Sequence, residues 1–239
     1  CDGDWDIAAG QFIHTFRSAI HVTDHIDESR AVEWLAGMDY GYTHYTVVLL
    51  GFLDADGSLY IVDEHAERGW VPQRHVPAIK AMFQRHRLLV GAPSSQPLGE
   101  YMKIRMRFDP PYSWRVSGIA AGGDLFSHQY DGSSIAAHFR DQGLRVIPAN
   151  TNRVQGWAEI ARRLGDLDAA INPTLFIHPR CARLLDCLPF LQHDPDQPAD
   201  VLKTNPNEEG LGGDDAADAL RYLVATPRHR AYQTKLRGL

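Results

Sequence analysis

The segment from Tyr45 to Leu53 constrains the fold of this chain more than any other. It is an almost unbroken apolar run, rich in Val, Leu and aromatic residues, which is typical of a buried strand. Residues 34–39 before it indicate a shorter strand. After a turn at residues 54–57, residues 58–64 alternate enough to form a returning strand. These three segments predict an antiparallel hairpin or meander.

The rest of the chain alternates between helical and strand patterns. Helical spacing or caps predict helices at 76–88, from Ser133 or Ser134 to Phe139, at 154–164, 180–188 and 214–224, and strands are predicted at 115–121, 144–148 and 174–178. Residues 91–114 carry four prolines and are expected to form a long loop or insertion. A meander followed by alternating helices and strands predicts an α/β fold with a mixed sheet.

Composition limits the class of protein. The 239 residues suit one domain with excursions, and 44% hydrophobic with 23% charged residues is ordinary for a globular protein. No apolar run approaches the ~18 residues of a membrane span, so no membrane contact is expected. The three cysteines contain no close pair, which favours a reducing compartment. A net charge of -6 argues against a strongly basic nucleic-acid binder, although a nuclease needs only a local basic face.

Acidic residues at the ends of predicted elements are the candidates for chemistry. Asp39 ends the first strand, Asp124 ends a later one, and Asp215 and Asp218 share one face of the last helix. Hard cations prefer carboxylate oxygens that converge from separate elements. Taken singly, such residues are usually turn residues or helix caps. The candidate set is Asp39, Asp124, Asp215 and Asp218, with Glu64 and Asp214 as reserves.

Two reserves have ordinary structural explanations. Glu64 more readily flanks the third strand than binds a metal. Asp214 lies roughly 100° from Asp215 around a helix of ~3.6 residues per turn. It is therefore expected to act as a helix-start acid, while Asp215 faces the cleft.

Several short motifs occur in a characteristic order. They are Gly37-Met38-Asp39-Tyr40-Gly41 before a hydrophobic strand, Leu59 to Glu64, Asp131 to Ala136, Asn152 to Trp157, Leu188-Pro189 with Gln192-His193-Asp194, and Asp214 to Tyr222. Together they resemble the nuclease domain at the C-terminal end of tailed-phage terminase large subunits. The closing helix is the most specific motif, and the resemblance covers nearly the whole chain.

The resemblance implies a ribonuclease-H-like mixed β-sheet flanked by helices. Residues 1–33 would be a lead-in segment or linker from a missing packaging ATPase domain, because Gly3-Asp4-Trp5-Asp6 resembles that linker and the chain begins with Cys. Residues 34–239 would be the nuclease domain, with an insertion near 91–114. No phosphate-binding loop is present in the sequence. The implied partners are double-stranded DNA, the ATPase domain, the portal and the small terminase subunit.

The resemblance implies a metal-dependent endonuclease that cleaves concatemeric double-stranded viral DNA during genome packaging, in the host cell cytoplasm. By resemblance Asp39, Asp124 and Asp215 bind Mg²⁺ or Mn²⁺, as two ions, with Asp218 in support. Many relatives have His where Asp215 stands, so the division of roles among Asp214, Asp215 and Asp218 stays open. Arg153 precedes a helix and could contact phosphate, although a salt bridge explains it equally well.

Two other readings compete with this one. A different ribonuclease-H-like nuclease, such as a junction resolvase, would share the fold and the acids. A catalytically silent docking module for a motor or portal would have no need of the acids. The linker-like start and the closing helix favour the terminase reading over the first, and the acids favour it over the second.

Overall fold

The computed structural model describes residues 10–90, 113–116, 118–128, 132–206 and 212–226. Its centre is a sheet with strand order β7-β6-β1-β2-β3-β8. Strands β1, β2 and β3 form the predicted antiparallel meander. Strand β6 pairs in parallel with β1, β7 with β6, and β8 with β3. The predicted mixed sheet is confirmed. The strands of this sheet are β1 (Glu33–Asp39), β2 (Tyr45–Leu53), β3 (Leu59–Arg68), β6 (Ile119–Ala121), β7 (Val146–Pro148) and β8 (Leu175–Ile177).

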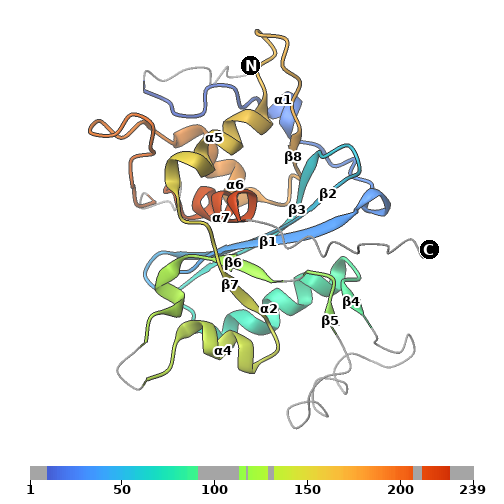
Figure 1. The fold of residues 1–239 in the computed structure, drawn as a ribbon, viewed down its shortest axis with the longest axis vertical. Coiled ribbons are helices and arrows are strands. Elements are labelled where there is room, and N and C mark those ends of the chain that lie inside the picture. Colours follow the sequence, from blue (N-terminus) through green and yellow to red (C-terminus); the bar gives the residue numbers. More distant parts are fainter. Residues whose placement is uncertain (1–9, 91–112, 117, 129–131, 207–211, 227–239) are drawn as a thin grey trace, which may run out of the picture.

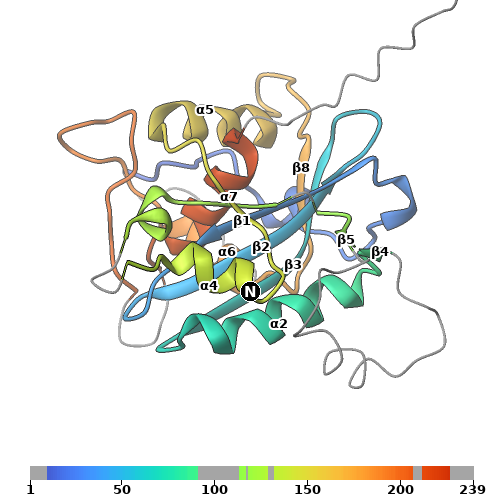
Figure 2. The ribbon, with the colours of Figure 1, turned by 60° about the horizontal axis from the view of Figure 1, so that its bottom comes forward.

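Helices cover both faces of the sheet (Figures 1 and 2). One apolar cluster packs between the sheet and α2 with α4, and a second packs between the sheet and α5, α6 and α7. The helices are α1 (Ser18–His21), α2 (Pro72–Arg85), α4 (Ile135–Asp141), α5 (Arg153–Leu164), α6 (Ala182–Cys187) and α7 (Asp215–Ala225). Short 3-10 turns are η1 (Glu28–Arg30), η3 (Gly123–Phe126) and η4 (Leu188–Phe190), and β4 (Leu89–Val90) pairs with β5 (Ser113–Trp114).

The closing helix α7 lies directly against β1 and β2. A side chain at Gly37 in β1 would collide with the carbonyl oxygen of Ala219 and with Leu223. Glycine therefore permits the close approach of helix and strand. The consequence is that the acidic start of α7 lies beside the end of β1.

Most predicted boundaries hold within a few residues. β2 has the predicted limits, whereas β3 continues to Arg68 rather than ending at Glu64. α2 begins at Pro72, because proline suits the first helical turn, where its missing N–H is not needed. Ser134 caps α4 by accepting a hydrogen bond from the Ala137 N–H. The predicted insertion at 91–114 lies, up to residue 112, outside the described residues.

None of the helices in the described ranges is both long and apolar enough to cross a membrane.

Candidate metal centre

Three elements bring the predicted acids to one edge of the sheet. Asp39 is the last residue of β1, opposite Val47 of β2. β6 runs parallel to β1, and Asp124 follows it in η3. Because parallel strands end at the same edge of a sheet, Asp124 lies on the Asp39 side. Asp215 and Asp218 come from the first turns of α7.

The electrostatics show that these acids surround Asp39. Burial raises the pKa of Asp39 from 3.8 to about 8, and neighbouring negative charges add to this effect. Those charges belong, in decreasing order of effect, to Asp218, Asp215, Asp214 and Asp124. Like charges that converge in a partly dehydrated site oppose ionisation. The site thus holds an excess of negative charge.

Asp214 and Asp215 each have a buried carboxylate oxygen, Oδ2, with no hydrogen-bond partner among the described residues. Burial and Asp218 raise the pKa of Asp214 to about 6. Burial also raises the pKa of Asp215, although His44, Arg183 and a hydrogen bond from the Tyr45 N–H oppose the rise. A buried polar atom without a partner is costly. These two oxygens are therefore suited to an added ligand.

Asp214 lies at the start of α7, as expected, but it is buried. Asp214 is the N-cap residue of α7, but its side chain accepts no capping hydrogen bond, and only 8% of the residue is exposed. The residue precedes the first residue of α7, although its backbone, at φ −112° and ψ −3°, lies in the right-handed helical region. Its side chain therefore adds charge near Asp39.

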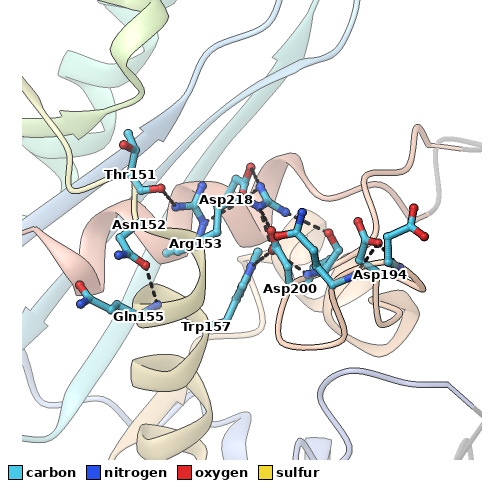
Figure 3. Close-up of polar contacts among 12 residues, drawn as sticks. Thr151, Asn152, Arg153, Gln155, Trp157, Asp194, Asp200 and Asp218 are labelled. Atoms are coloured by element: carbon cyan, nitrogen blue, oxygen red, sulfur yellow. Dashed lines mark hydrogen bonds and ion pairs between the residues drawn. The ribbon is translucent and has the colours of Figure 1, made fainter.

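Asp218 is held by two arginines, of which Figure 3 labels Arg153. Its Oδ1 accepts from Arg221 Nε at 2.9 Å, and its Oδ2 accepts from Arg153 Nη1 at 3.1 Å. Its side chain is 5% exposed. Both oxygens thus have cationic partners, unlike those of Asp214 and Asp215. This geometry suits the supporting role expected of Asp218.

Arg153 is engaged within the protein at all three nitrogens. Its Nε donates to both oxygens of Asp200 at 2.8 and 2.7 Å, and its Nη2 donates to the Val201 carbonyl at 3.1 Å. Figure 3 shows Arg153 between Asp218 and Asp200. The structure thus shows the salt bridge that was the alternative explanation for Arg153. Contact with phosphate stays a prediction.

Tyr222 is a site residue that the sequence reasoning missed. A Cβ placed on Gly122 would lie 2.8 Å from Asp124 Oδ1 and 3.1 Å from the Tyr222 hydroxyl, so both groups flank Gly122. Burial, with the charges of Asp218 and Asp39, raises the pKa of Tyr222 to about 12. The hydroxyl therefore stays protonated and able to donate. Its position four residues after Asp218, on the same helical face, was the signal that could have identified it.

Glu64 has a structural role at a different place. Its carboxylate accepts hydrogen bonds from the Arg183 and Leu184 N–H groups, both at 2.8 Å. These are free N–H groups of the first turn of α6, which an acid satisfies well. Burial raises the pKa of Glu64 to about 7 in spite of these bonds. Glu64 thus fixes α6 against β3.

The acids around Asp39 fit a divalent cation in chemistry, though not as a preformed cage. Carboxylate oxygens from β1, η3 and α7 are the hard ligands that Mg²⁺ and Mn²⁺ prefer, and two of the acids offer partnerless buried oxygens. Within the described ranges, no three acidic, His or Cys side chains already stand where they could hold an ion. Binding would therefore require the side chains to close together.

Comparison with known proteins gives structural matches alone. No protein-family model and no curated protein matches the chain. The large terminase of thermophilic bacteriophage D6E (crystal form 2) superposes with a TM-score of 0.61 at 16% identity, over 90% of this chain and 44% of that one. Its complex with ATP-gamma-S gives 0.60 at 17%, over 94% and 47%. The chain thus spans less than half of the D6E protein.

The P22 large terminase nuclease domain matches over almost its full length. The TM-score is 0.59 at 15% identity, and the match covers 90% of each chain. With identities this low, the likeness concerns the fold. It agrees with the strand order and helix layers seen here. The predicted α/β class with a mixed sheet flanked by helices is confirmed, and the chain has a fold similar to that of the P22 large terminase nuclease domain.

Proposed function

We propose that this chain is a divalent-metal-dependent endonuclease domain that cleaves concatemeric double-stranded viral DNA during genome packaging. The observation that carries the proposal is the gathering of acids from β1, η3 and α7 at one edge of the sheet, where burial and then the charges of four further acids raise the pKa of Asp39 to about 8. A fold without a metal to bind gains nothing from such repulsion. The likeness to the P22 nuclease domain supports DNA cleavage as the activity.

Asp39, Asp124 and Asp215 are the proposed metal ligands, since they come from three elements that meet at one edge of the sheet. Two Mg²⁺ or Mn²⁺ ions, when bound, would supply an activated water and stabilise the leaving oxygen of a phosphodiester. Asp218 is a positioning residue, because Arg153 and Arg221 fix its carboxylate. Its charge strengthens the negative field at Asp39.

Tyr222 adds a proton donor to the same edge. Its hydroxyl lies beside Gly122 with Asp124 Oδ1, and its pKa of about 12 keeps it neutral. A neutral hydroxyl can donate a hydrogen bond to a carboxylate or to a phosphate oxygen. We assign it the task of orienting the Asp124 carboxylate.

The wider assembly follows from the same proposal. Residues 1–33 would lead in from a packaging ATPase domain, and residues 34–239 would form the nuclease with an insertion near 91–114. The D6E large terminase is more than twice the length matched here, which leaves room for such a domain. Portal, small terminase subunit and host cytoplasm complete the proposed setting.

A cleavage assay tests the proposal. The protein is incubated with linear duplex DNA, or with a four-way junction, in Mg²⁺ or Mn²⁺ with and without excess chelator. Cleavage of the duplex that stops in chelator supports the proposal. Cleavage confined to junctions would favour a resolvase, and duplex binding without cleavage in either metal would favour a docking module.

A further inference from the structure

A cavity of about 510 Å³ lies at the other end of β1 from the acids. It is bounded by the start of β1 and by the C-terminal end of α2. Trp34 and Asp39 are separated by five residues of strand, about 17 Å, and Trp34 packs in the core on the α2 side. The cavity is therefore separate from the metal centre. The lining residues that matter are Glu28, Trp34, Arg85, His86, Arg87 and Arg115.

The acids in and beneath this cavity are already neutralised. Asp63 Oδ2 accepts from Arg85 Nη2 at 2.9 Å and from His86 Nε2 at 2.9 Å. His86 Nδ1 lies 2.7 Å from Glu28 Oε1. Arg85 and His86 thus contact the carboxylates of Asp63 and Glu28.

Arg87 and Arg115 are the two lining cations without an acidic partner among the described residues. Both are exposed, and across the ranges that the structure describes neither side chain forms an ion pair. The Arg115 N–H donates to the Leu88 carbonyl at 2.8 Å, which joins its segment to the end of α2. Two separate parts of the chain therefore bring to one cavity guanidinium groups that form no ion pair with any described residue, in a protein of net charge -6.

The backbone of Arg87 is unusual for a residue with a side chain. Arg87 has φ of 53°, at the position after α2 where glycine is preferred. The hydrogen bond from Leu88 N–H to the Phe83 carbonyl closes the helix there. Arginines near a helix C-terminus also favour the helix dipole. That effect explains neither an arginine in a left-handed backbone nor Arg115.

We propose that this cavity binds a phosphate group, from the DNA backbone or from a free nucleotide, through Arg87 and Arg115. Planar guanidinium groups match phosphate oxygens in paired hydrogen bonds. A volume of about 510 Å³ lies within the usual range of small-ligand sites. The site does not depend on the proposed nuclease activity, because it uses none of the acids around Asp39.

Binding measurements on the full chain without divalent metal test the site. Calorimetry with inorganic phosphate, a deoxynucleoside monophosphate and a short duplex compares the parent with Arg87→Gln/Arg115→Gln. The control, Arg68→Gln/Arg140→Gln, removes the same charge from two exposed arginines outside the cavity. Loss of at least about tenfold in affinity confined to the cavity variant is expected. If phosphate and nucleotide show it, the source is a free ligand; if only the duplex shows it, the source is DNA.

A second variant separates binding from folding. Arg87→Gly removes the guanidinium and relieves the left-handed backbone, so its Tm should equal or exceed that of the parent while affinity falls. Equal affinities of the cavity and control variants for all three probes would overturn the proposal. So would parent-like affinity in Arg87→Gly/Arg115→Gln. Neither outcome depends on whether the protein cleaves DNA.

Discussion

Asp39 and Asp63 are both partly or fully buried acids on neighbouring parts of one sheet, yet their surroundings are opposite. Asp63 accepts from Arg85, His86 and its own neighbour's N–H, and these bonds hold its pKa low against the effect of burial. Burial, followed by the charges of four further acids, raises the pKa of Asp39 to about 8. Basic partners therefore compensate the charge of Asp63, whereas neighbouring acids repel the charge of Asp39.

The difference separates structural from functional acids. A compensated acid such as Asp63 stabilises the fold and needs no ligand. A cluster of uncompensated acids destabilises the fold unless a cation binds, so it persists where binding is useful. Asp218 lies between the two cases, since arginines hold it while its charge acts on Asp39. Substitutions in each group should therefore give opposite results.

The largest effect is expected for Asp39→Ala. Cleavage of duplex DNA should fall by a factor on the order of 10³ or more, because a metal ligand at the reacting centre is lost. The melting temperature should stay equal or rise slightly, since repulsion is relieved. Rate and Tm are measured on the same preparation. A variant that melts far below the parent would show that Asp39 is structural.

The α7 acids should differ from each other. Asp215→Ala is expected to lose about 10² or more in rate, and Asp214→Ala much less, because Asp214 lies outside the helix and has a cation, Lys203, nearby. Asp215→His should keep part of the activity, with Mn²⁺ better than Mg²⁺, because imidazole suits the softer ion. Rates of the three variants in each metal decide this. If Asp214→Ala is inactive and Asp215→Ala is not, Asp214 is the metal ligand in place of Asp215.

Substitution of Asp63 should lower stability and leave cleavage unchanged, the reverse of the effect expected at Asp39. Asp63→Ala leaves His86 without one of its two carboxylate partners and is expected to lower the free energy of unfolding by about 2–3 kcal/mol. Cleavage by the folded fraction should stay near that of the parent, since the metal centre is untouched. Urea unfolding and the cleavage rate are compared. Unchanged stability with lost activity would contradict the assignment.

The last effect concerns pH. The folded pKa of Asp39 is about 8, above its ordinary 3.8, so metal-free protein loses stability as pH rises from about 4 to about 8. Asp63 has the opposite sign: its lowered pKa gives stability that is lost as pH falls below about 4. Thermal melts of parent and Asp39→Asn across this range should show a flatter profile for the variant above pH 5. Parallel profiles of parent and variant would contradict the raised pKa of Asp39.

Local sequence patterns were sufficient for the strands that carry the site. The apolar run of β2 defines its own limits, and Asp39 follows directly from the end of β1. The length of β3 was underestimated, because His65, Glu67 and Arg68 are polar and do not give the apolar pattern of a strand. Pairing with β2 keeps these residues extended. Tertiary contact overrides local preference there.

The roles of several polar residues could not be predicted, because their partners lie far away in sequence. Glu64 caps a helix that begins more than a hundred residues later, and Arg153 bridges Asp200 and Asp218. Asp214 lies at the start of the last helix, as predicted, but its burial depends on how that helix packs. Such contacts depend on how α5, α6 and α7 pack on the sheet, which no local pattern determines.

The most direct test of the central claim is a crystal structure of the protein with Mn²⁺, using the anomalous signal of the metal. The account predicts a peak within about 2.2 Å of an Asp39 carboxylate oxygen, shared with Asp124 or Asp215, and no peak at the compensated Asp63. A peak only at other acids, or none at Asp39 when Mn²⁺ saturates the protein in solution, would contradict it.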